Sequence, residues 1–161
     1  MILVDWQIKK LCEQRDLVTP YDETLVNPSS LDVRLGDTIV LDNGDEYNIS
    51  ESVYNLSPNE FILGCTLEYL IIPDNCSIDF KLKSSRAREG WAHSLAAWAE
   101  CGFQGSLTLE LKNYRERELE VYKGLKIGQL VIHEHALPDK SYKNTDYSYS
   151  KKPQSSRYVN I

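Results

Sequence analysis

The stretch EFILGCTLEYLIIPDNCSIDFKL, residues 60–82, decides the fold class of this 161-residue chain. It holds two strand-like apolar runs, 60–70 and 76–82, on either side of the turn signal Pro73-Asp74-Asn75. Short β-prone runs bounded by Pro, Asp, Asn and Gly are typical of β-strands separated by turns. This part of the chain is therefore predicted to be β-structure.

The same signal recurs on both sides of this stretch. Further strands are predicted at 33–41, 105–111, 118–122 and 127–133. Helical periodicity is confined to 5–15, where Ile8, Leu11 and Cys12 share a face and Asp5 is placed to cap the first turn. Many short strands with one short helix favour a mainly β sandwich or barrel over βαβ units.

Composition predicts one globular domain and excludes several partners. The chain is 42% hydrophobic and 26% charged, with a net charge of −6, which disfavours nucleic acid as a partner. No apolar run reaches the roughly 18–20 residues of a membrane span, and the N-terminus does not resemble a signal peptide. Four cysteines without a Cys-x-x-Cys pair favour reduced thiols, so we expect a cytoplasmic protein.

The charge is unevenly distributed along the chain. Residues 138–161 hold five basic and two acidic side chains, a net charge of +3, which leaves −9 for the remainder. This segment has four tyrosines and no strand-like run, so it is expected to be disordered or to order only on a surface or ligand. An acidic body with a basic, tyrosine-rich tail fits a small anionic ligand under a mobile lid.

Several common catalytic motifs are absent from the sequence. It has neither the His-x-Glu nor the Pro-Cys-x-x-Cys element of zinc nucleobase deaminases. A Gly-x-Ser-x-Gly elbow, a Walker loop and a Gly-x-Gly-x-x-Gly loop are also missing. His133 and His135 would lie on one face of a strand, but no third ligand is indicated, and a solvated strand end is the simpler interpretation.

Three segments could carry chemistry. The cluster Lys83-Ser84-Ser85-Arg86-Ala87-Arg88 follows a strand, and its hydroxyl and cationic donors suit phosphate oxygens. Glu110 lies inside a predicted strand, on the face opposite to Leu109 and Leu111. It could act as a general base, or it could simply face solvent. Residues 98–105 place aromatic residues and glycines around Glu100, as in a hairpin beside a flat ligand or in a plain turn.

Six segments, in order along most of the chain, resemble the dCTP deaminase family. Asn27–Gly36 is similar to its P-x-S-x-D-x-R-x-G signature, and Lys83–Arg88 is similar to (R/K)-S-S-x-A-R. Ala96–Gly105 resembles the hairpin A-G-W-I-D-x-G-F-x-G. The other three are Phe61–Thr66, similar to a strand of the family; Leu109–Leu111, similar to L-E-(L/F/I); and Gly124–Leu130, similar to G-M-x-I-G-Q-L.

The resemblance implies a mainly β fold, the dUTPase-like distorted jelly-roll β-barrel, with a short N-terminal helix and an extended C-terminal tail. It implies a catalytic domain over 1–137 and a flexible basic tail over 138–161 that closes over the triphosphate. It also implies a homotrimer with active sites between subunits. Mg²⁺ would accompany the triphosphate, and the protein would hold no zinc.

The resemblance also implies roles for individual residues. Glu110 would shuttle protons, Ser84 and Arg88 would orient the attacking water, and the Ala96 carbonyl would accept a hydrogen bond from that water. The implied substrate-binding residues are Lys83, Ser85, Trp98, Glu100, Phe103, Gln129, Tyr149, Lys151 and Gln154.

The implied reaction is the deamination of dCTP, or of a modified deoxycytidine triphosphate, to dUTP and ammonia. The alternative is a dUTP diphosphatase, or a bifunctional enzyme that gives dUMP and diphosphate. A third reading is a nucleotide-binding regulator without turnover. Glu100 stands where the family usually has Asp, and its extra methylene moves the carboxylate by roughly one ångström, which disfavours the alternative. Arg86 and Glu89 stand at usually apolar positions, and they motivate the modified substrate and the regulator.

Overall fold

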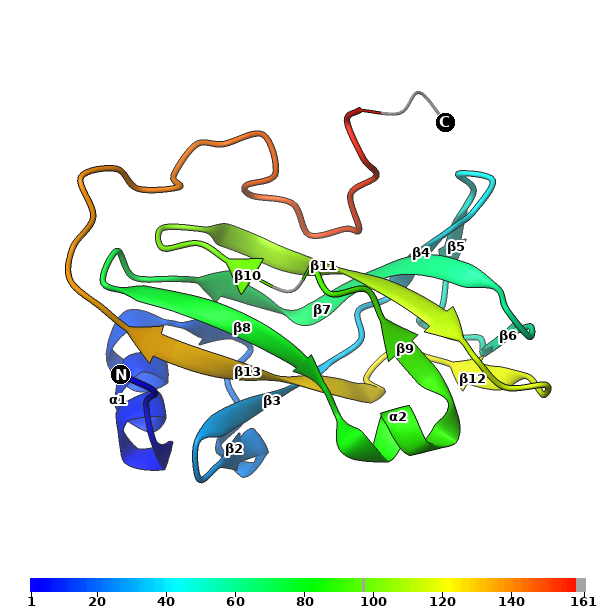
Figure 1. Cartoon of the computed structure of the whole chain (residues 1–161), viewed down its shortest axis with the longest axis horizontal. Helices are drawn as coiled ribbons and strands as arrows, with labels where there is room; N and C mark the ends of the chain where they lie inside the picture. The colour runs from blue at the N-terminus through cyan, green and yellow to red at the C-terminus, as the bar shows by residue number, and fades with distance from the viewer. Residues whose placement is uncertain (97, 159–161) are drawn as a thin grey trace.

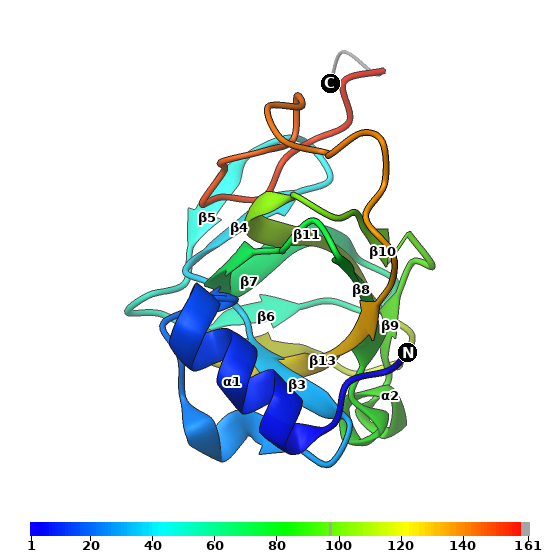
Figure 2. The same ribbon diagram turned by 90° about the vertical axis from the view of Figure 1, so that its left-hand side faces the viewer.

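The computed structural model describes residues 1–96 and 98–158. Two antiparallel β-sheets face each other as a flattened barrel, and helix α1 (Asp5–Arg15) lies at one end of it (Figures 1 and 2). The other elements are β1 (Val18–Thr19), the 3₁₀ turn η1 (Glu23–Leu25), β2 (Val26–Asn27), β3 (Ser30–Arg34), β4 (Thr38–Leu41), β5 (Glu46–Asn48), β6 (Tyr54–Leu56), β7 (Phe61–Ile71), β8 (Cys76–Leu82), α2 (Ser84–Glu89), β9 (Trp91–His93), β10 (Trp98–Ala99), β11 (Gln104–Asn113), β12 (Leu119–Val121) and β13 (Lys126–Glu134).

The two sheets are built on long strand pairs. The first has the order β5-β4-β7-β11-β9, with β1 also paired to β7, and the second has the order β10-β8-β13-β3-β2. Strands β6 and β12 form a separate pair. The turn at Pro73-Asp74-Asn75 carries the chain from β7 in the first sheet to β8 in the second. The two runs that define the fold class therefore do not pair with each other but form opposite walls of the barrel.

The hydrophobic core lies between the sheets. Ile62 and Leu70 of β7 and Ile78 and Phe80 of β8 are at most 1% exposed. Alternation of side chains along each strand places these four residues on the inner face of their sheet. On β11 the same alternation buries Leu109 and Leu111 and turns Glu110 to the opposite face, as predicted.

The single strand predicted at 33–41 is wrong. Strand β3 ends at Arg34, and β4 begins at Thr38 in the other sheet. At the crossing, the Leu35 amide donates to Leu125 O and the Gly36 amide donates to Cys65 O, both at 2.8 Å. A Cβ on Gly36 would lie 3.2 Å from Cys65 Sγ, so glycine permits this close approach.

Helix α1 has the predicted bounds, but Asp5 does not cap it. The N-cap is Val4, whose amide donates to Gln7 Oε1 at 3.1 Å. Asp5 is the first helical residue, and its Oδ1 accepts from the neighbouring Trp6 amide. Ile8 and Cys12 are buried and Leu11 packs against the core, which confirms the predicted apolar face.

The segment that follows β8 is a short helix rather than an isolated turn. α2 spans Ser84–Glu89 and ends at Gly90, whose φ of 108° is left-handed. A residue with a Cβ is strained at this angle, which explains why the helix stops at glycine. None of the α2 residues is buried. The helix is therefore an exposed projection between β8 and β9 (Figure 1).

Candidate functional site

Glu110 lies in a cavity of about 610 Å³. Strand β11 presents it there, and the β10–β11 hairpin and the C-terminal tail form the other walls. The sequence-predicted residues that line this cavity with Glu110 are Ala96, Trp98, Glu100, Phe103 and Gln154. We call this cavity the Glu110 pocket.

Two poorly hydrated ionisable groups meet beside the pocket: Glu110, which lines it, and His93, which contacts Glu110 but does not line the pocket. Burial raises the pKa of Glu110, and burial lowers the pKa of His93 to about 4. His93 Nε2 lies 3.4 Å from Glu110 Oε2, and neither atom has a hydrogen-bond partner among the described residues. Because His93 is neutral near pH 7, this approach is a contact between a carboxyl group and a neutral ring, not an ion pair. Such a carboxyl group is well placed to take up and release a proton.

Sequence reasoning missed His93. It belongs to the three-residue strand β9, which pairs with β11 so that His93 is the register partner of Leu111. The ring also packs on Phe80, with centroids 4.8 Å apart. A three-residue strand gives too little periodicity to predict, so only the pairing with β11 brings His93 to Glu110.

The hairpin before β11 forms the pocket rim. Its turn is closed by the Phe103 amide, which donates to Glu100 O at 3.2 Å, and Gly102 has a left-handed φ of 82°. Trp98 is 53% exposed and Glu100 is also exposed, whereas Phe103 is buried against Tyr142. The rim thus presents an aromatic face and a free carboxylate to any molecule that enters the pocket.

The basic segment does not reach the Glu110 pocket within one chain. Ser84, Ser85 and Arg88 are exposed on α2 and are absent from the pocket lining. Lys83, immediately before the helix, pairs with Asp32 at 2.5 Å.

Lys83 belongs to a second polar group, which we call the Lys83 cluster: Asn27, Ser30, Asp32, Lys83 and Gln129. Asp32 also accepts from Asn27 Nδ2 at 2.8 Å, and Ser30 Oγ donates to Gln129 Oε1 at 2.9 Å. Asp32 and Gln129 are register partners of β3 and β13. The structure therefore brings Lys83 and Gln129 to one cluster beside α2 and leaves the carboxylate of Glu110 elsewhere.

Arg34 of the first signature is part of a buried link between the sheets. Its Nε donates to Glu68 Oε1 at 2.7 Å, and its amide donates to Glu68 Oε2 at 2.9 Å. Glu68 is 1% exposed, and it reaches β3 of the second sheet from β7 of the first. Burying a carboxylate is costly unless it is paired and hydrogen-bonded, so this arginine serves the fold.

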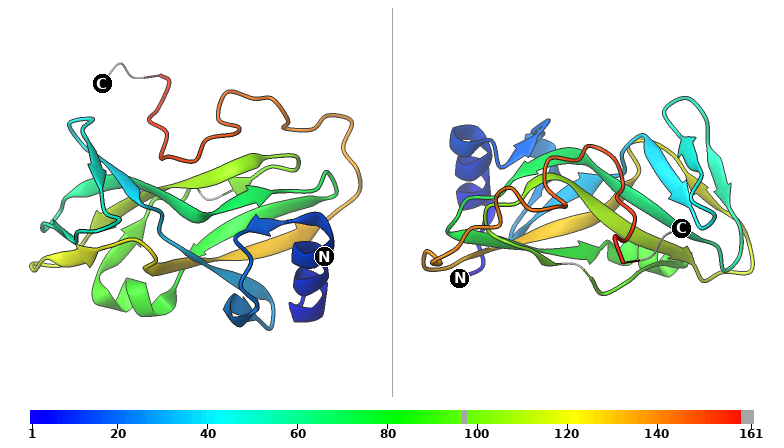
Figure 3. Two further views of the ribbon diagram at one scale, coloured as in Figure 1. Left: turned by 180° about the vertical axis from the view of Figure 1, so that it is seen from behind. Right: turned by 90° about the horizontal axis from the view of Figure 1, so that it is seen from above.

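The C-terminal tail lies on the barrel. Residues 149–154, which we call the strap, run beside β11 (Figure 3). The Tyr149 amide donates to Gln104 O at 2.6 Å, the Ser106 amide to Ser150 O at 2.8 Å, and the Gln154 amide to Thr108 Oγ1 at 3.1 Å. The tail described as far as Tyr158 is thus ordered on the molecule's own surface.

Of the three tail residues predicted to bind substrate, only Gln154 lines the Glu110 pocket. The backbone of the strap is fixed on β11, and Lys151 consequently lines a different cavity. The Tyr149 hydroxyl donates to Asn144 Oδ1 at 2.7 Å. In place of these two residues, the tail contributes Tyr142, Tyr147 and Tyr158 to the Glu110 pocket. The only sequence signal for this was the richness of the tail in tyrosine.

The paired histidines have other contacts. His133 packs near Trp98, with ring centroids 5.6 Å apart, and His135 Nε2 is 2.9 Å from Ser77 Oγ. In residues 1–96 and 98–158, no group of three or more His, Cys, Asp or Glu side chains is arranged to hold a metal ion. No described helix is long and apolar enough to cross a membrane.

Comparison with known proteins identifies the family. A family model described as dCTP deaminase-like matches residues 2–135. The chain belongs to the dCTP deaminase-like family. A protein named dCTP deaminase, dUMP-forming, from Methanoregula boonei is 36% identical over 167 residues, which cover 92% of this chain and 91% of the relative. A protein of the same name from Aquifex aeolicus is 36% identical over 148 residues, which cover 82% and 81%.

Solved structures confirm the predicted fold of this dCTP deaminase-like protein. A 2'-deoxycytidine 5'-triphosphate deaminase from Agrobacterium tumefaciens superimposes with a TM-score of 0.72 at 22% identity, covering 83% of this chain and 47% of that one. A dUTPase from Streptococcus mutans superimposes with a TM-score of 0.50 at 16% identity, covering 77% and 97%. The dUTPase-like mainly β fold is therefore confirmed. The relatives named dCTP deaminase, dUMP-forming show that the family is one of enzymes.

Proposed function

We propose that this protein converts dCTP to dUMP, ammonia and diphosphate. The observation that carries the proposal is the half-buried carboxyl of Glu110, with a raised pKa, on the floor of a pocket with an aromatic rim. Relatives named dUMP-forming favour this bifunctional alternative over a reaction that stops at dUTP. They also weigh against a regulator without turnover.

In the first step, water adds to C4 of the cytosine ring, the C4–N bond breaks and ammonia leaves. Glu110 accepts the proton of the attacking water and delivers protons to the ring and the departing amine. The Ala96 carbonyl holds the same water from the pocket wall. His93 is neutral, and its ring packs on Phe80. The ring therefore restricts bulk water around the carboxyl group.

The positions of Ser84 and Arg88 support a homotrimer. The Glu110 pocket lacks a cation near the carboxylate among the described residues, whereas α2 projects from the surface with both side chains exposed. If α2 of a second copy enters the pocket, Arg88 keeps Glu110 ionised and Ser84 orients the water. Each active site then also has Lys83 and Gln129 of the second copy's Lys83 cluster, together with Ser85 of its α2, for the triphosphate.

In the second step, water attacks the α-phosphorus, the bond to the bridging oxygen breaks, and diphosphate leaves. We assign the activation of this water to Glu100, whose carboxylate is exposed at the pocket rim. Its extra methylene relative to Asp slows this step and leaves the first step unchanged. Trp98 and Phe103 flank the nucleoside.

Mg²⁺ is proposed to enter with the triphosphate. Because no described group of three acidic, histidine or cysteine side chains is arranged to hold an ion, the phosphate oxygens and water would supply its ligands. The ion would neutralise charge on the triphosphate.

The tail is proposed to be a lid over the substrate. Gln154 and three tyrosines already line the pocket, and residues 138–161 carry a net charge of +3. Deleting 138–161 should raise the KM for dCTP, and unchanged kinetics would contradict the lid.

Product analysis tests the proposal directly. The purified protein is incubated with dCTP or dUTP and Mg²⁺, and ammonia, dUTP, dUMP and diphosphate are followed. We expect ammonia, dUMP and diphosphate from dCTP. Release of dUTP alone would reduce the function to deamination, and no product from a folded trimer would overturn it. A modified deoxycytidine triphosphate in the panel tests the influence of Arg86 and Glu89.

Two matched variants separate the steps. Glu110→Gln should lower ammonia release from dCTP by at least about 100-fold while diphosphate release from dUTP continues. Glu100→Gln should lower diphosphate release from dUTP while ammonia release from dCTP continues. Equal loss of both products in both variants would contradict this division of roles.

A further inference from the structure

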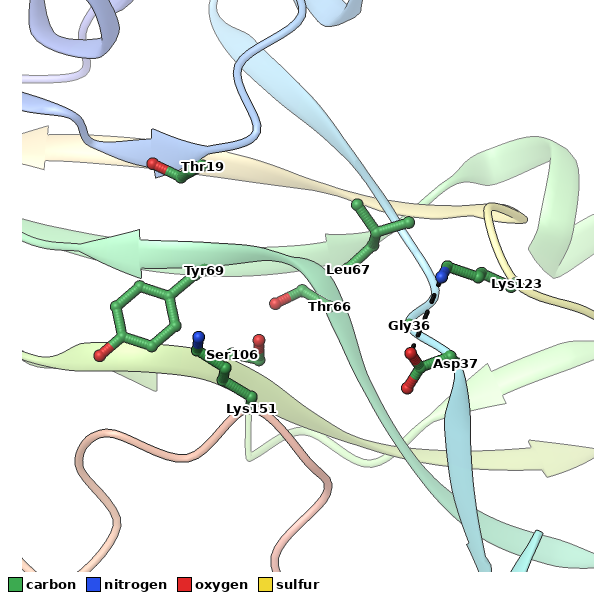
Figure 4. A pocket seen from close by; sticks show the side chains of 9 residues that line it. All are labelled: Thr19, Gly36, Asp37, Thr66, Leu67, Tyr69, Ser106, Lys123 and Lys151. Carbon is green, nitrogen blue, oxygen red and sulfur yellow. Dashed lines mark ion pairs between the residues drawn. The ribbon is translucent and has the colours of Figure 1, made fainter. Parts of the chain in front are cut away.

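A second cavity lies on the other side of the strap. It has a volume of about 690 Å³, and of the residues that the resemblance implies for the site it holds only Lys151. Figure 4 shows Thr19, Tyr69, Ser106 and Lys151 at one side of it and Asp37 and Lys123 at the other. We call it the bulge pocket, because an irregularity of the sheet forms its floor.

The irregularity lies in the pairing of β7 with β11. Ser106 pairs with Tyr69 and Thr108 pairs with Cys65, so three residues of β7 face the single residue Leu107. Thr66 fills the gap in the ladder, since its hydroxyl accepts from the Leu107 amide at 2.9 Å and donates to Glu68 O at 2.7 Å. Bulges of this kind redirect side chains and are frequent beside functional sites.

The bulge leaves several donors without partners. Thr19, Tyr69, Ser106 and Lys151 make no side-chain hydrogen bond or ion pair through their hydroxyl or ammonium groups to any described residue. Across the pocket, Lys123 and Asp37 are 3.7 Å apart, a loose pair with both side chains nearly half exposed. Besides the hydrogen-bonded Thr66, three hydroxyl groups and two ammonium groups thus line one cavity with a single carboxylate.

We propose that the bulge pocket binds a phosphate-type oxyanion, through Lys151, Tyr69 and Ser106 at one end and Lys123 at the other. Phosphate oxygens accept several hydrogen bonds at once, and lysine and hydroxyl donors satisfy them without a fixed geometry. The site is separate from the Lys83 cluster and does not rest on the proposed function. The oxyanion is either a free ion such as diphosphate or the phosphate chain of a nucleotide.

An occupant of this pocket would act on the lid. Lys151 belongs to the strap, its carbonyl faces Cys65 Sγ at 3.7 Å, and Ser106 lines both cavities. An anion held by Lys151 therefore fixes the strap on β11, with Gln154 in the Glu110 pocket. Binding of an anion in the bulge pocket is thereby coupled to the order of the strap, which forms part of the wall of the Glu110 pocket.

The test is calorimetry and ³¹P NMR on the full chain with inorganic diphosphate as probe. All proteins carry Lys83→Gln, which weakens binding at the other predicted phosphate site. One protein adds Tyr69→Phe with Lys123→Gln, and its matched control adds Tyr114→Phe with Lys10→Gln, both exposed and outside the pocket. Circular dichroism and thermal melting verify that all three are folded.

We expect one diphosphate per chain in the Lys83→Gln protein and in the control, and about tenfold weaker binding in the pocket variant. A parallel titration with dCTP distinguishes the two sources. If dCTP binds more tightly than diphosphate and the pocket variant weakens that binding, the site is assigned to nucleotides. If the pocket variant weakens the binding of diphosphate alone, the site is assigned to free ions. No diphosphate binding after Lys83→Gln, or equal affinity in the pocket variant and the control, would overturn the proposal.

Discussion

Glu110 and His93 each have a buried side-chain atom that the folded chain leaves without a hydrogen-bond partner. Both side chains are poorly hydrated, and their facing atoms lack hydrogen-bond partners among the described residues. Buried polar atoms are normally satisfied, and the exceptions often mark sites where a substrate or a second protein completes the network. Under the proposed function, the partners that complete Glu110 would be a water, a cytosine and the arginine of another copy.

The Glu110→Gln variant should be more stable than the natural protein at neutral pH. Because burial raises the pKa of Glu110, its ionised form destabilises the folded state at pH values above that pKa. The stability difference between the variant and the natural protein should vanish as the pH falls below the pKa of glutamate in the unfolded chain, about 4.3. Chemical denaturation from pH 4 to 8 on the isolated subunit measures it. A Gln variant less stable than the natural protein throughout would show that Glu110 is already paired.

His93 should titrate near pH 4 by NMR. Burial lowers its pKa to about 4 from 6.5, so the unfolded chain binds a proton first as the pH falls. As the pH falls from 6.5 to about 4, His93 therefore lowers the free energy of unfolding. The His93→Asn variant should lose less stability than the natural protein over that interval. A midpoint near 6.5 for the His93 ring would mean that the ring is open to water.

At the scale of elements, the tail is fixed to the barrel before it reaches the pocket. Asp74, in the turn between β7 and β8, accepts from Ser141 Oγ at 2.7 Å and from Lys143 Nζ at 2.9 Å. A Cβ at Gly102 would lie 2.0 Å from Ser141 Oγ, so this glycine lets the tail cross the hairpin closely. These hydrogen bonds lower the pKa of Asp74, which means that the folded state prefers the carboxylate.

Asp74→Ala should release the start of the tail. We expect faster proteolytic cleavage within 138–158 and a several-fold higher KM for dCTP with little change in kcat, since the variant loses charge-assisted hydrogen bonds to the tail and removes no group assigned to the chemistry. Asp139→Ala is the matched control, because Asp139 is exposed and makes no side-chain hydrogen bond or ion pair to a described residue. Equal protease sensitivity of both variants would exclude this anchor.

At the scale of the whole molecule, the predicted site is divided. The Glu110 pocket lies between β11, the hairpin and the tail, and the Lys83 cluster lies at the junction of β3, β13 and α2. Figure 1 shows α2 projecting below the barrel and the tail crossing above it. One copy thus offers the Glu110 pocket on one face and an exposed basic helix on the other.

Mixed oligomers test this division. Glu110→Gln and Arg88→Ala should each be inactive alone, and subunits of the two variants mixed by unfolding and refolding should regain deaminase activity. Sites that pair a natural Glu110 from one copy with a natural Arg88 from another are intact. Native mass spectrometry confirms the mixing. Mixed trimers without activity would place both residues in the same subunit's site.

Long elements could be predicted closely, whereas of the strands with two or three residues only β12, predicted at 118–122 and found at Leu119–Val121, was anticipated as a strand. The strands of β7, β8, β11 and β13 and the helix α1 have strong periodicity over seven or more residues, and their bounds differ little from the prediction. The crossing at Gly36 and the strands β9 and β10 were missed. A two- or three-residue strand is decided by the partner it pairs with, and no local pattern specifies that partner.

The sequence by itself determined the family, the mainly β fold and the residue types of the chemistry, because motif spacing and alternation are properties of the chain alone. The tertiary structure decided which of these residues meet. It placed His93 beside Glu110, turned Lys151 into a separate cavity, and put Lys83 with Gln129 in a cluster away from Glu110. Pairing between strands distant in sequence sets these distances and the burial that shifts each pKa, and neither is encoded by spacing along one strand.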